Sequence, residues 1–350
     1  MELLISIFFI FIVSVVFYAL KVPLVLSYII SGFIASFFIH IELEIIEIIN
    51  ELAISVLLFF IGFEFSYNKI HMYIRQSFWG NFFTFTIFFV LGTTVAYTIS
   101  NDLRSAFIFS LILYPSSSMV IVKILQSTKR LANLETPFII ITLILEDIFL
   151  GVFIGILKGS YFPILNAILV VLAIAINFKF RNKIKQFVKF LISLEREFFL
   201  VVTFFLIISS TFILDSPIGA FILGIVISDT YEGFFENHIS VLREIIFIAF
   251  FFCFGYILKG TLLGNLNLLH ISLAFVLLIL SIFIKIINFF QIGNKRVIIR
   301  TLLTMAPRGE FSVFSVYFIE HQEIKIIAAV FVLFSVFLGS ILSIYAKLIK

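Results

Sequence analysis

The stretch TPFIIITLILEDIFLG, residues 136–151, decides the fold of this chain. It sets two adjacent carboxylates, Glu146 and Asp147, in a run that is otherwise apolar. Similar runs recur along all 350 residues, of which 62% are apolar and 13% are charged. Soluble domains contain about 25% charged residues, and a globular core of this length cannot bury so much apolar surface. The sequence therefore predicts an all-α polytopic membrane protein.

Thirteen apolar stretches are candidate membrane helices, since a bilayer core takes roughly 20 residues of helix. They are residues 3–20, 23–39, 51–65, 77–99, 103–127, 136–157, 161–178, 197–214, 216–230, 242–258, 267–291, 297–319 and 325–347. The first has no basic flank before it and no small-residue cleavage site after it. We therefore expect a membrane helix there and not a signal peptide.

Basic residues in the connections set the orientation, because cytoplasmic loops are enriched in Lys and Arg. If the N-terminus is outside, the cytoplasmic segments hold 17 of these residues and the outside segments hold four. The four are Arg104, Lys158, Lys259 and Lys325. We therefore expect a protein of the plasma membrane with its N-terminus outside and its C-terminus in the cytoplasm. The outside loop after residues 23–39 is acidic, with Glu42, Glu44, Glu47 and Glu51.

Three pairs of landmarks recur at a nearly constant offset. They are Gly32 and Gly224, 192 residues apart; Gly62 and Gly255, 193 apart; and Pro115 and Pro307, 192 apart. The members of each pair are seven positions apart in the order of predicted helices, and because seven is odd the two copies have opposite orientations. This is the inverted-repeat plan of many secondary transporters. We expect a first repeat at 1–158, a linking helix and basic cytoplasmic loop at 159–196, and a second repeat at 197–350.

Two prolines fall inside predicted helices at corresponding positions of the repeats. Proline removes a backbone N–H and clashes with the preceding turn. Polar residues follow each proline: Ser116, Ser117 and Ser118 after Pro115, and Arg308, Gly309 and Glu310 after Pro307. We expect two crossed broken helices, which are tolerated where protein or water satisfies the freed backbone groups. Such paired breaks mark the substrate site of a transporter; two simple proline kinks are the alternative.

Charges inside the predicted helices are costly and indicate either function or ion pairing. Adjacent residues point about 100° apart on a helix, so one of Glu146 and Asp147 can face an ion while the other faces a partner. Lys285, midway along its helix, is the available partner. Lys123 in the first broken helix carries a further charge, as do Arg308 and Glu310 in the second. For each of these residues, an ion pair that only ties helices together is the alternative.

Several classes of protein are not expected from this sequence. The basic residues lie between apolar runs, so nucleic-acid binding is not predicted. The single Cys253 excludes an intramolecular disulfide. The sequence has neither transition-metal ligand spacing nor a nucleophile–base pattern, so we expect neither a cofactor nor an enzyme. All five histidines, His270 among them, fall near loops or helix ends, where we expect them to be solvated or interfacial.

Five segments in this order resemble the monovalent cation:proton antiporter family that includes the Kef potassium-efflux systems and the NapA-type sodium/proton exchangers. They are VPLVLSYIISG (22–32), LFFIGFEF (58–65), SSSMVIVKIL (116–125), the Glu146–Asp147 pair, and RGEF (308–311). The resemblance implies a homodimeric, elevator-like exchanger. A core of helices four to six and eleven to thirteen would carry the ion past a dimer-forming scaffold.

The resemblance also implies roles for single residues. Asp147 would bind the transported monovalent cation, and Lys285 would pair with Glu146. Pro307 stands where Gln is common in the family, so the second break is expected to differ in geometry. The chain ends at Lys350, so we expect no cytosolic regulatory domain of the Kef kind.

The expected mechanism needs one site with two exclusive occupants, a cation or a proton on Asp147. An empty charged site would bear the full cost of desolvation and stay in place. Hydroxyls of Ser116, Ser117 and Thr142 would complete an oxygen shell for a hard cation. We expect Na⁺ as the cation, with K⁺ as the other candidate. A sodium-coupled symporter of an organic solute is the alternative function, although few polar residues lie near the breaks to bind such a solute.

Overall fold

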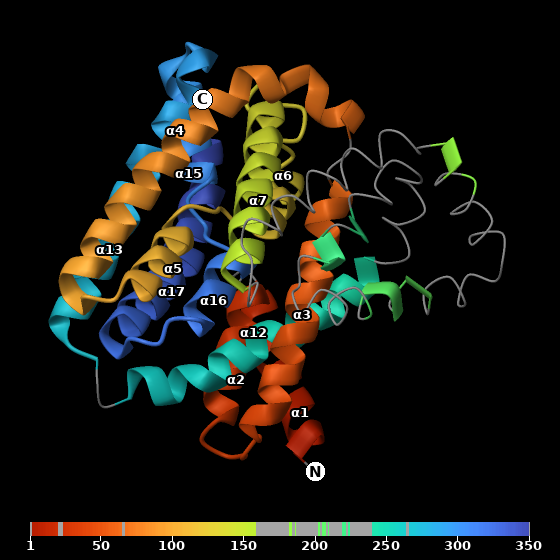
Figure 1. Ribbon diagram of the computed structural model, residues 1–350, viewed down its shortest axis with the longest axis vertical. Coiled ribbons are helices and arrows are strands. Elements are labelled where there is room, and N and C mark those ends of the chain that lie inside the picture. Colours follow the sequence, from red (N-terminus) through yellow and green to blue (C-terminus); the bar gives the residue numbers. More distant parts are fainter. Residues whose placement is uncertain are drawn as a thin grey trace. The chain divides into compact units, whose positions relative to one another are not determined.

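The computed structural model describes residues 2–19, 24–64, 67–158 and 240–349 without 264 and 265, and isolated positions between 182 and 224. The described segments are helical (Figure 1). They divide into two compact units. One contains Met1–Glu42, Ile74–Glu146 and Phe251–Lys350, and the other contains Leu43–Tyr73 and Asp147–Phe250. The predicted helices 161–178, 197–214 and 216–230 and the basic loop lie largely outside the described residues.

The described helices fall on the predicted apolar stretches, but α3 begins eight residues and α4 ten residues earlier than expected. Their bounds are α1 Glu2–Ala19, α2 Leu24–Ala35, α3 Leu43–Glu64, α4 Tyr67–Ser100, α5 Leu103–Leu113, α6 Ser118–Ser127, α7 Thr136–Lys158, α12 Ser240–Leu262, α13 Leu268–Ile284, α14 Ile286–Phe289, α15 Lys295–Thr304, α16 Glu310–Tyr317 and α17 Gln322–Tyr345, with 3₁₀ turns η1 Phe290–Ile292 and η2 Ala346–Leu348. Four described helical segments are long and apolar enough to cross a membrane: Ser77–Ser100, Glu244–Leu262, Leu268–Phe289 and Gln322–Leu348. The helical membrane class is thus confirmed, while the count of thirteen and the inverted repeats remain predictions.

Two of the predicted helices are interrupted around their prolines. The stretch 103–127 forms α5 and α6 with residues 114–117 between them, and Pro115 lies in that gap. The stretch 297–319 forms α15 and α16 with residues 305–309 between them, and Pro307 lies in that gap. Ser116, Ser117, Arg308 and Gly309 therefore lie on non-helical backbone, where amides and carbonyls are free to bond elsewhere. Ser118 and Glu310 are the first residues of α6 and α16.

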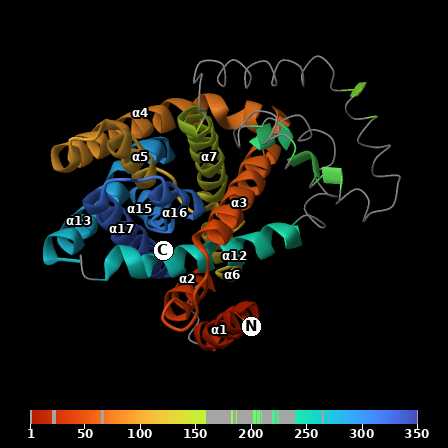
Figure 2. The same ribbon diagram turned by 60° about the horizontal axis from the view of Figure 1, so that its bottom comes forward.

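The two breaks lie against each other. The amide of Ser117 donates to the carbonyl of Pro307 at 2.9 Å, and the Ser312 hydroxyl of α16 donates to the carbonyl of Ile112 in α5, also at 2.9 Å. A Cβ atom on Gly309 would come within 2.7 Å of the Ser117 Cα, so the close approach requires glycine there. α5, α16 and α17 accordingly lie side by side in both views (Figure 1, Figure 2).

The other halves of the broken helices share an apolar core with their neighbours. This core joins α6, α7, α14 and α15 through Ile121, Leu125, Ile139, Leu143, Phe289, Ile298, Leu302 and Met305. Apolar contact on one side of the breaks and hydrogen bonds at the breaks fix the two crossed helices relative to each other.

The predicted helix 267–291 is not continuous, which corrects the expectation from its apolar pattern. α13 ends at Ile284, Lys285 adopts a turn, and α14 starts at Ile286. The amide of Lys285 donates to the carbonyl of Phe283, while the carbonyl of Ser281, its regular helical partner, accepts from Arg308 at 3.3 Å. A side chain inserted into the helical ladder is a recognised cause of such an interruption.

The acidic outside loop was also predicted wrongly in part. Glu44, Glu47 and Glu51 belong to α3, which begins eight residues earlier than expected. Their spacing of three and four residues places them on one exposed helical face, and Ile46 and Asn50 are buried on the opposite face. A helix continues past the apolar stretch when one face is charged and the other is packed.

Glycines bring α2 and α12 together. A Cβ atom on Gly32 would lie 1.9 Å from the Phe252 carbonyl oxygen, and one on Gly255 would lie 1.9 Å from that of Ile29. Small residues at such crossings let helix backbones approach closely in membranes. Both glycines were landmarks of the predicted repeat, and here each has a packing role.

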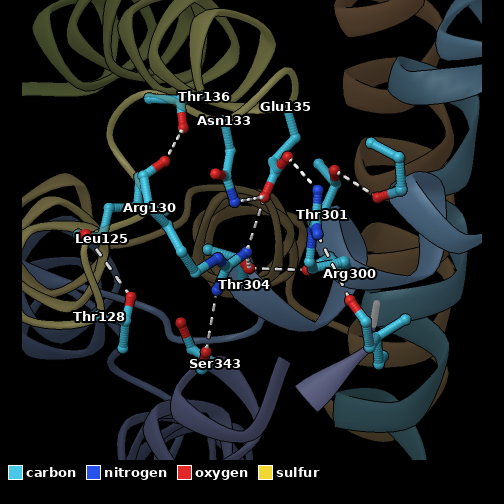
Figure 3. Close-up of polar contacts among 12 residues, drawn as sticks. Leu125, Thr128, Arg130, Asn133, Glu135, Thr136, Arg300, Thr301, Thr304 and Ser343 are labelled. Atoms are coloured by element: carbon cyan, nitrogen blue, oxygen red, sulfur yellow. Dashed lines mark hydrogen bonds and ion pairs between the residues drawn. The ribbon is translucent and has the colours of Figure 1, made fainter. Parts of the chain in front are cut away.

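A charge cluster around the buried Glu135 connects several segments of the first unit. Arg130 Nη2 lies 3.2 Å from Glu135 Oε1, and Arg300 Nη2 lies 2.6 Å from the other oxygen (Figure 3). Arg130 also donates to Thr304 at 2.7 Å, and Arg300 donates to the carbonyl of Ile349 at 3.4 Å. The cluster therefore joins the link between α6 and α7 to α15 and to the end of the chain.

Two further polar contacts connect elements of the first unit. Arg104 and Glu320 form an exposed ion pair at 2.7 Å. His270, at the start of α13, contacts the carboxylate of Glu323 in α17 and caps its own helix together with Asn267. His270 is only 1% exposed, so it is not solvated, because α17 covers this end of its helix; an interfacial position stays a prediction.

Candidate functional site

A buried ion pair lies beside the two breaks. Lys285 Nζ is 2.6 Å from Glu146 Oε1, and the two side chains are 1% and 0% exposed. The interruption between α13 and α14 presents the lysine, and the middle of α7 presents the acid. The structure thus brings together the two charges that the sequence analysis paired, because each would be costly to bury alone.

Ser116 completes the surroundings of this pair. Its amide donates to Glu146 Oε2 at 2.7 Å, so both oxygens of Glu146 accept hydrogen bonds. Its hydroxyl donates to the carbonyl of Met305 at 3.0 Å and accepts from Lys285 Nζ. One residue of the first break therefore contacts the acid, the base and the second break.

Arg308 brings a second positive charge to the same place. The guanidinium is fully buried, and its Nη1 donates to the Ser116 hydroxyl at 3.2 Å. Its Cζ lies 5.8 Å from the ring centre of Phe88, while Lys285 Nζ lies 6.0 Å from that of Tyr114. Aromatic faces attract cations at such distances. Both basic side chains are buried, so these contacts take the place of contact with solvent.

The ends of the half-helices meet at these charges. α6 and α16 begin at the breaks, and α5 and α15 end there. Free amides at helix starts favour negative charge, and free carbonyls at helix ends favour positive charge or donors. Two contacts follow this rule: the amide of Ser116 donates to Glu146, and the carbonyl of Met305 accepts from the Ser116 hydroxyl.

The other predicted site residues lie on the same elements. Asp147 follows Glu146 in α7 and is 3% exposed, and Thr142 is buried one turn earlier. Ser117 is buried, and its hydroxyl accepts from the amide of Val120 at 3.3 Å, which supports the start of α6. Ser118 is the first residue of α6. Lys123 lies in α6, and Glu310 is the first residue of α16.

Comparison with known proteins decides the family. Residues 5–348 match the family described as sodium/hydrogen exchanger, transmembrane. The chain belongs to this sodium/hydrogen exchanger family. The match confirms the predicted membership in the monovalent cation:proton antiporters and covers nearly the whole exchanger chain.

Two named relatives are antiporter subunits. The exchanger is 29% identical over 287 residues to the K(+)/H(+) antiporter subunit KhtU of Bacillus subtilis, covering 77% of this chain and 71% of that one. It is 23% identical over 355 residues to the Ammonium/H(+) antiporter subunit AmhT of Alkalihalophilus pseudofirmus, covering 95% and 89%.

The site of the exchanger includes residues that sequence reasoning missed. Ser281 takes part through its backbone carbonyl, which accepts from Arg308 at 3.3 Å, so its residue type gave no signal. Asn288, three residues after Lys285, accepts from the Thr84 hydroxyl at 2.5 Å and donates to Asn81 at 3.1 Å, and these three side chains form a buried polar contact between α14 and α4. The carbonyl of Met305 had no signal in the sequence, because any residue type supplies a carbonyl.

Proposed function

We propose that this exchanger moves a monovalent cation one way across the membrane and protons the other way, with Asp147 as the residue that binds either. The observation that carries the proposal is the buried Glu146–Lys285 pair at the crossing of two broken helices. Asp147 is the next residue of α7 after Glu146 and is buried as well. A hard cation prefers oxygen ligands, and Thr142 and Ser117 are further oxygen-bearing candidates.

Exchange follows from the cost of burying charge. A carboxylate that holds a cation or a proton is neutralised, whereas an empty one keeps its full desolvation cost. The loaded forms cross the barrier and the empty form does not, so outward and inward movements are linked. An elevator-like movement of the crossed helices relative to a homodimeric scaffold is part of this proposal.

The cation is proposed to be K⁺, Na⁺ or ammonium. Na⁺ was the first expectation from the sequence, whereas the two relatives are named for K⁺ and for ammonium. Their names favour including larger monovalent ions, which lose their hydration shells more readily than Na⁺. A symporter of organic solutes is not favoured, since both relatives are named antiporters.

The test is proton movement in vesicles. Wild-type protein in liposomes with an internal pH dye should show proton flux on addition of Na⁺, K⁺ or ammonium, each as the chloride and without organic solute. Asp147→Asn should abolish this flux while the protein stays folded, since the ligand of the cation and the carrier of the proton are lost together. Exchange near the wild-type rate in Asp147→Asn would overturn the assignment of the site.

A further inference from the structure

The hydroxyl of Ser116 has no free hydrogen-bonding position. A serine hydroxyl has one donor and two acceptor lone pairs. The donor goes to the carbonyl of Met305 at 3.0 Å. The two lone pairs face Lys285 Nζ and Arg308 Nη1, the latter at 3.2 Å. A transported cation would need one of these lone pairs, and it would approach an oxygen that already faces two positive charges.

We propose that Ser116 is a positioning residue, whose hydroxyl holds Lys285 and Arg308 beside Glu146 and does not ligate the transported cation in this conformation. The proposal rests on the proposed exchange function and refines it, because Ser116 was expected to be an ion ligand. The backbone amide of Ser116 also donates to Glu146 Oε2. One residue therefore positions the acid through its amide and the two bases through its hydroxyl.

The surroundings keep Ser116 in this place. The neighbouring amide of Ser117 donates to Pro307 at 2.9 Å, and the second break approaches so closely that Gly309 has no room for a side chain. Arg308 uses its other nitrogen, Nη2, on the carbonyl of Ser281, which keeps the helix open at Lys285. The Ser116 hydroxyl is therefore the point where the first break, the second break and the interruption of α13 are joined.

Ser312 supplies a matched control. It is a fully buried serine whose hydroxyl also donates to a carbonyl across the crossed helices, that of Ile112 at 2.9 Å. Among the described side chains its hydroxyl contacts no charged group. Ser312→Ala and Ser116→Ala therefore lose a similar neutral bond, and only Ser116→Ala removes an acceptor from two cations.

The test compares both variants in liposomes with Na⁺, K⁺ and ammonium. Ser116→Ala should lower turnover per folded protein roughly tenfold, as expected for a lost charge-assisted bond, with unchanged KM and unchanged rate ratios among the cations. Ser312→Ala should exchange like the wild type, and Ser116→Thr, which keeps the hydroxyl, should recover most of the turnover. A raised KM with normal turnover, or altered cation ratios, in Ser116→Ala would identify a direct ligand and overturn the proposal.

A second measurement does not depend on transport. Thermal unfolding in detergent is compared for Ser116→Ala, Lys285→Gln and the double variant. The proposal is supported if the double variant loses less stability than the two single variants lose together. Strictly additive losses would overturn it. Ser116→Cys, of similar size but a weaker acceptor, replaces Ser116→Ala if that variant does not fold. If wild-type liposomes exchange none of the cations, the proposed function fails while this result still decides the role of Ser116.

Discussion

At the scale of single residues, Glu135 is the acid whose loss should destabilise the protein most clearly away from the exchange site. Each of its oxygens pairs with a different arginine, so Glu135→Gln leaves two partly or fully buried guanidinium groups without their charged acceptor. Breaking a buried pair in this way costs about 3–5 kcal/mol, measured as thermal or denaturant unfolding in detergent. Glu320→Gln is the control, because the exposed Arg104–Glu320 pair should contribute about 0–1 kcal/mol.

The same residue predicts a pH dependence. Burial alone would raise the pKa of Glu135, but hydrogen bonds from its own backbone, Arg300 and Asn133 hold that pKa below its ordinary value of 4.5. Such a group stabilises the fold above its unfolded pKa, and the contribution disappears as the pH falls through the folded pKa. The stability gap between wild type and Glu135→Gln should be full at neutral pH and shrink on acidification below 4.5. A gap that stays constant in acid would contradict this account.

Glu146 and Lys285 should behave as a unit. Glu146→Gln or Lys285→Gln alone leaves one buried charge unpaired, which typically costs about 3–5 kcal/mol. The double variant carries no such charge and should unfold at a higher temperature than either single variant. Strictly additive losses in thermal unfolding would show that the two residues act separately, despite the 2.6 Å contact.

Single residues also show what the sequence could reveal of the site. The partnership of Glu146 with Lys285 was predictable, since both charges lie in apolar runs and each needs a partner. The full set of hydrogen bonds to the Ser116 hydroxyl was not predictable, because it depends on the carbonyl of Met305 and on the position of the Arg308 side chain. A charge in an apolar run can be seen in the sequence itself. The partners of the Ser116 hydroxyl in the second break lie 189 and 192 residues further along the chain, so no local pattern shows them.

At the scale of helices, Gly309 should determine how closely the two breaks cross. A Cβ atom there would meet the Cα and Cβ of Ser117 at 2.7 Å, so Gly309→Ala must push the breaks apart. Overpacking of this kind costs about 1–3 kcal/mol, and exchange should fall with it. Thermal unfolding and vesicle flux measure both effects.

Gly260→Ala in α12 is the matched control for this change. A Cβ atom on Gly260 meets nothing within 4 Å, and alanine is the better helix former by up to about 1 kcal/mol. This variant should be as stable as the wild type or slightly more stable. If Gly309→Ala behaved in the same way, the close crossing of the breaks would not be required for the fold.

The breaks at Pro115 and Pro307 were predicted from the sequence, whereas the interruption at Lys285 was not. Pro115 and Pro307 act locally through the missing N–H, so their effect was visible in the sequence. The interruption at Lys285 has neither proline nor glycine beside it. Its cause is Arg308, which takes the Ser281 carbonyl from a distant part of the chain. Interruptions caused by tertiary contact are invisible to a reading of helical periodicity.

At the scale of the whole molecule, the compact units do not follow the chain in order. The first unit combines segments from the start, middle and end of the sequence, and its crossed helices come from both predicted repeats. The boundaries of the two units do not coincide with 158 and 196, and the division into repeats stays a prediction. The repeat and the orientation in the membrane are linked, because copies seven helices apart must point in opposite directions.

Orientation can therefore be tested by labelling. A cysteine at the exposed Leu134, between α6 and α7, should react with an impermeant maleimide only from the cytoplasmic side, and one at Glu320 only from outside. The charge bias of 17 basic residues against four motivates both assignments. The wild-type chain is the control, since its one cysteine, Cys253, is 2% exposed and should label little. Labelling of both positions from one side would exclude the predicted helix count between them. Reversal of both would keep the count and invert the protein, so the lysine and arginine bias would then not set its orientation.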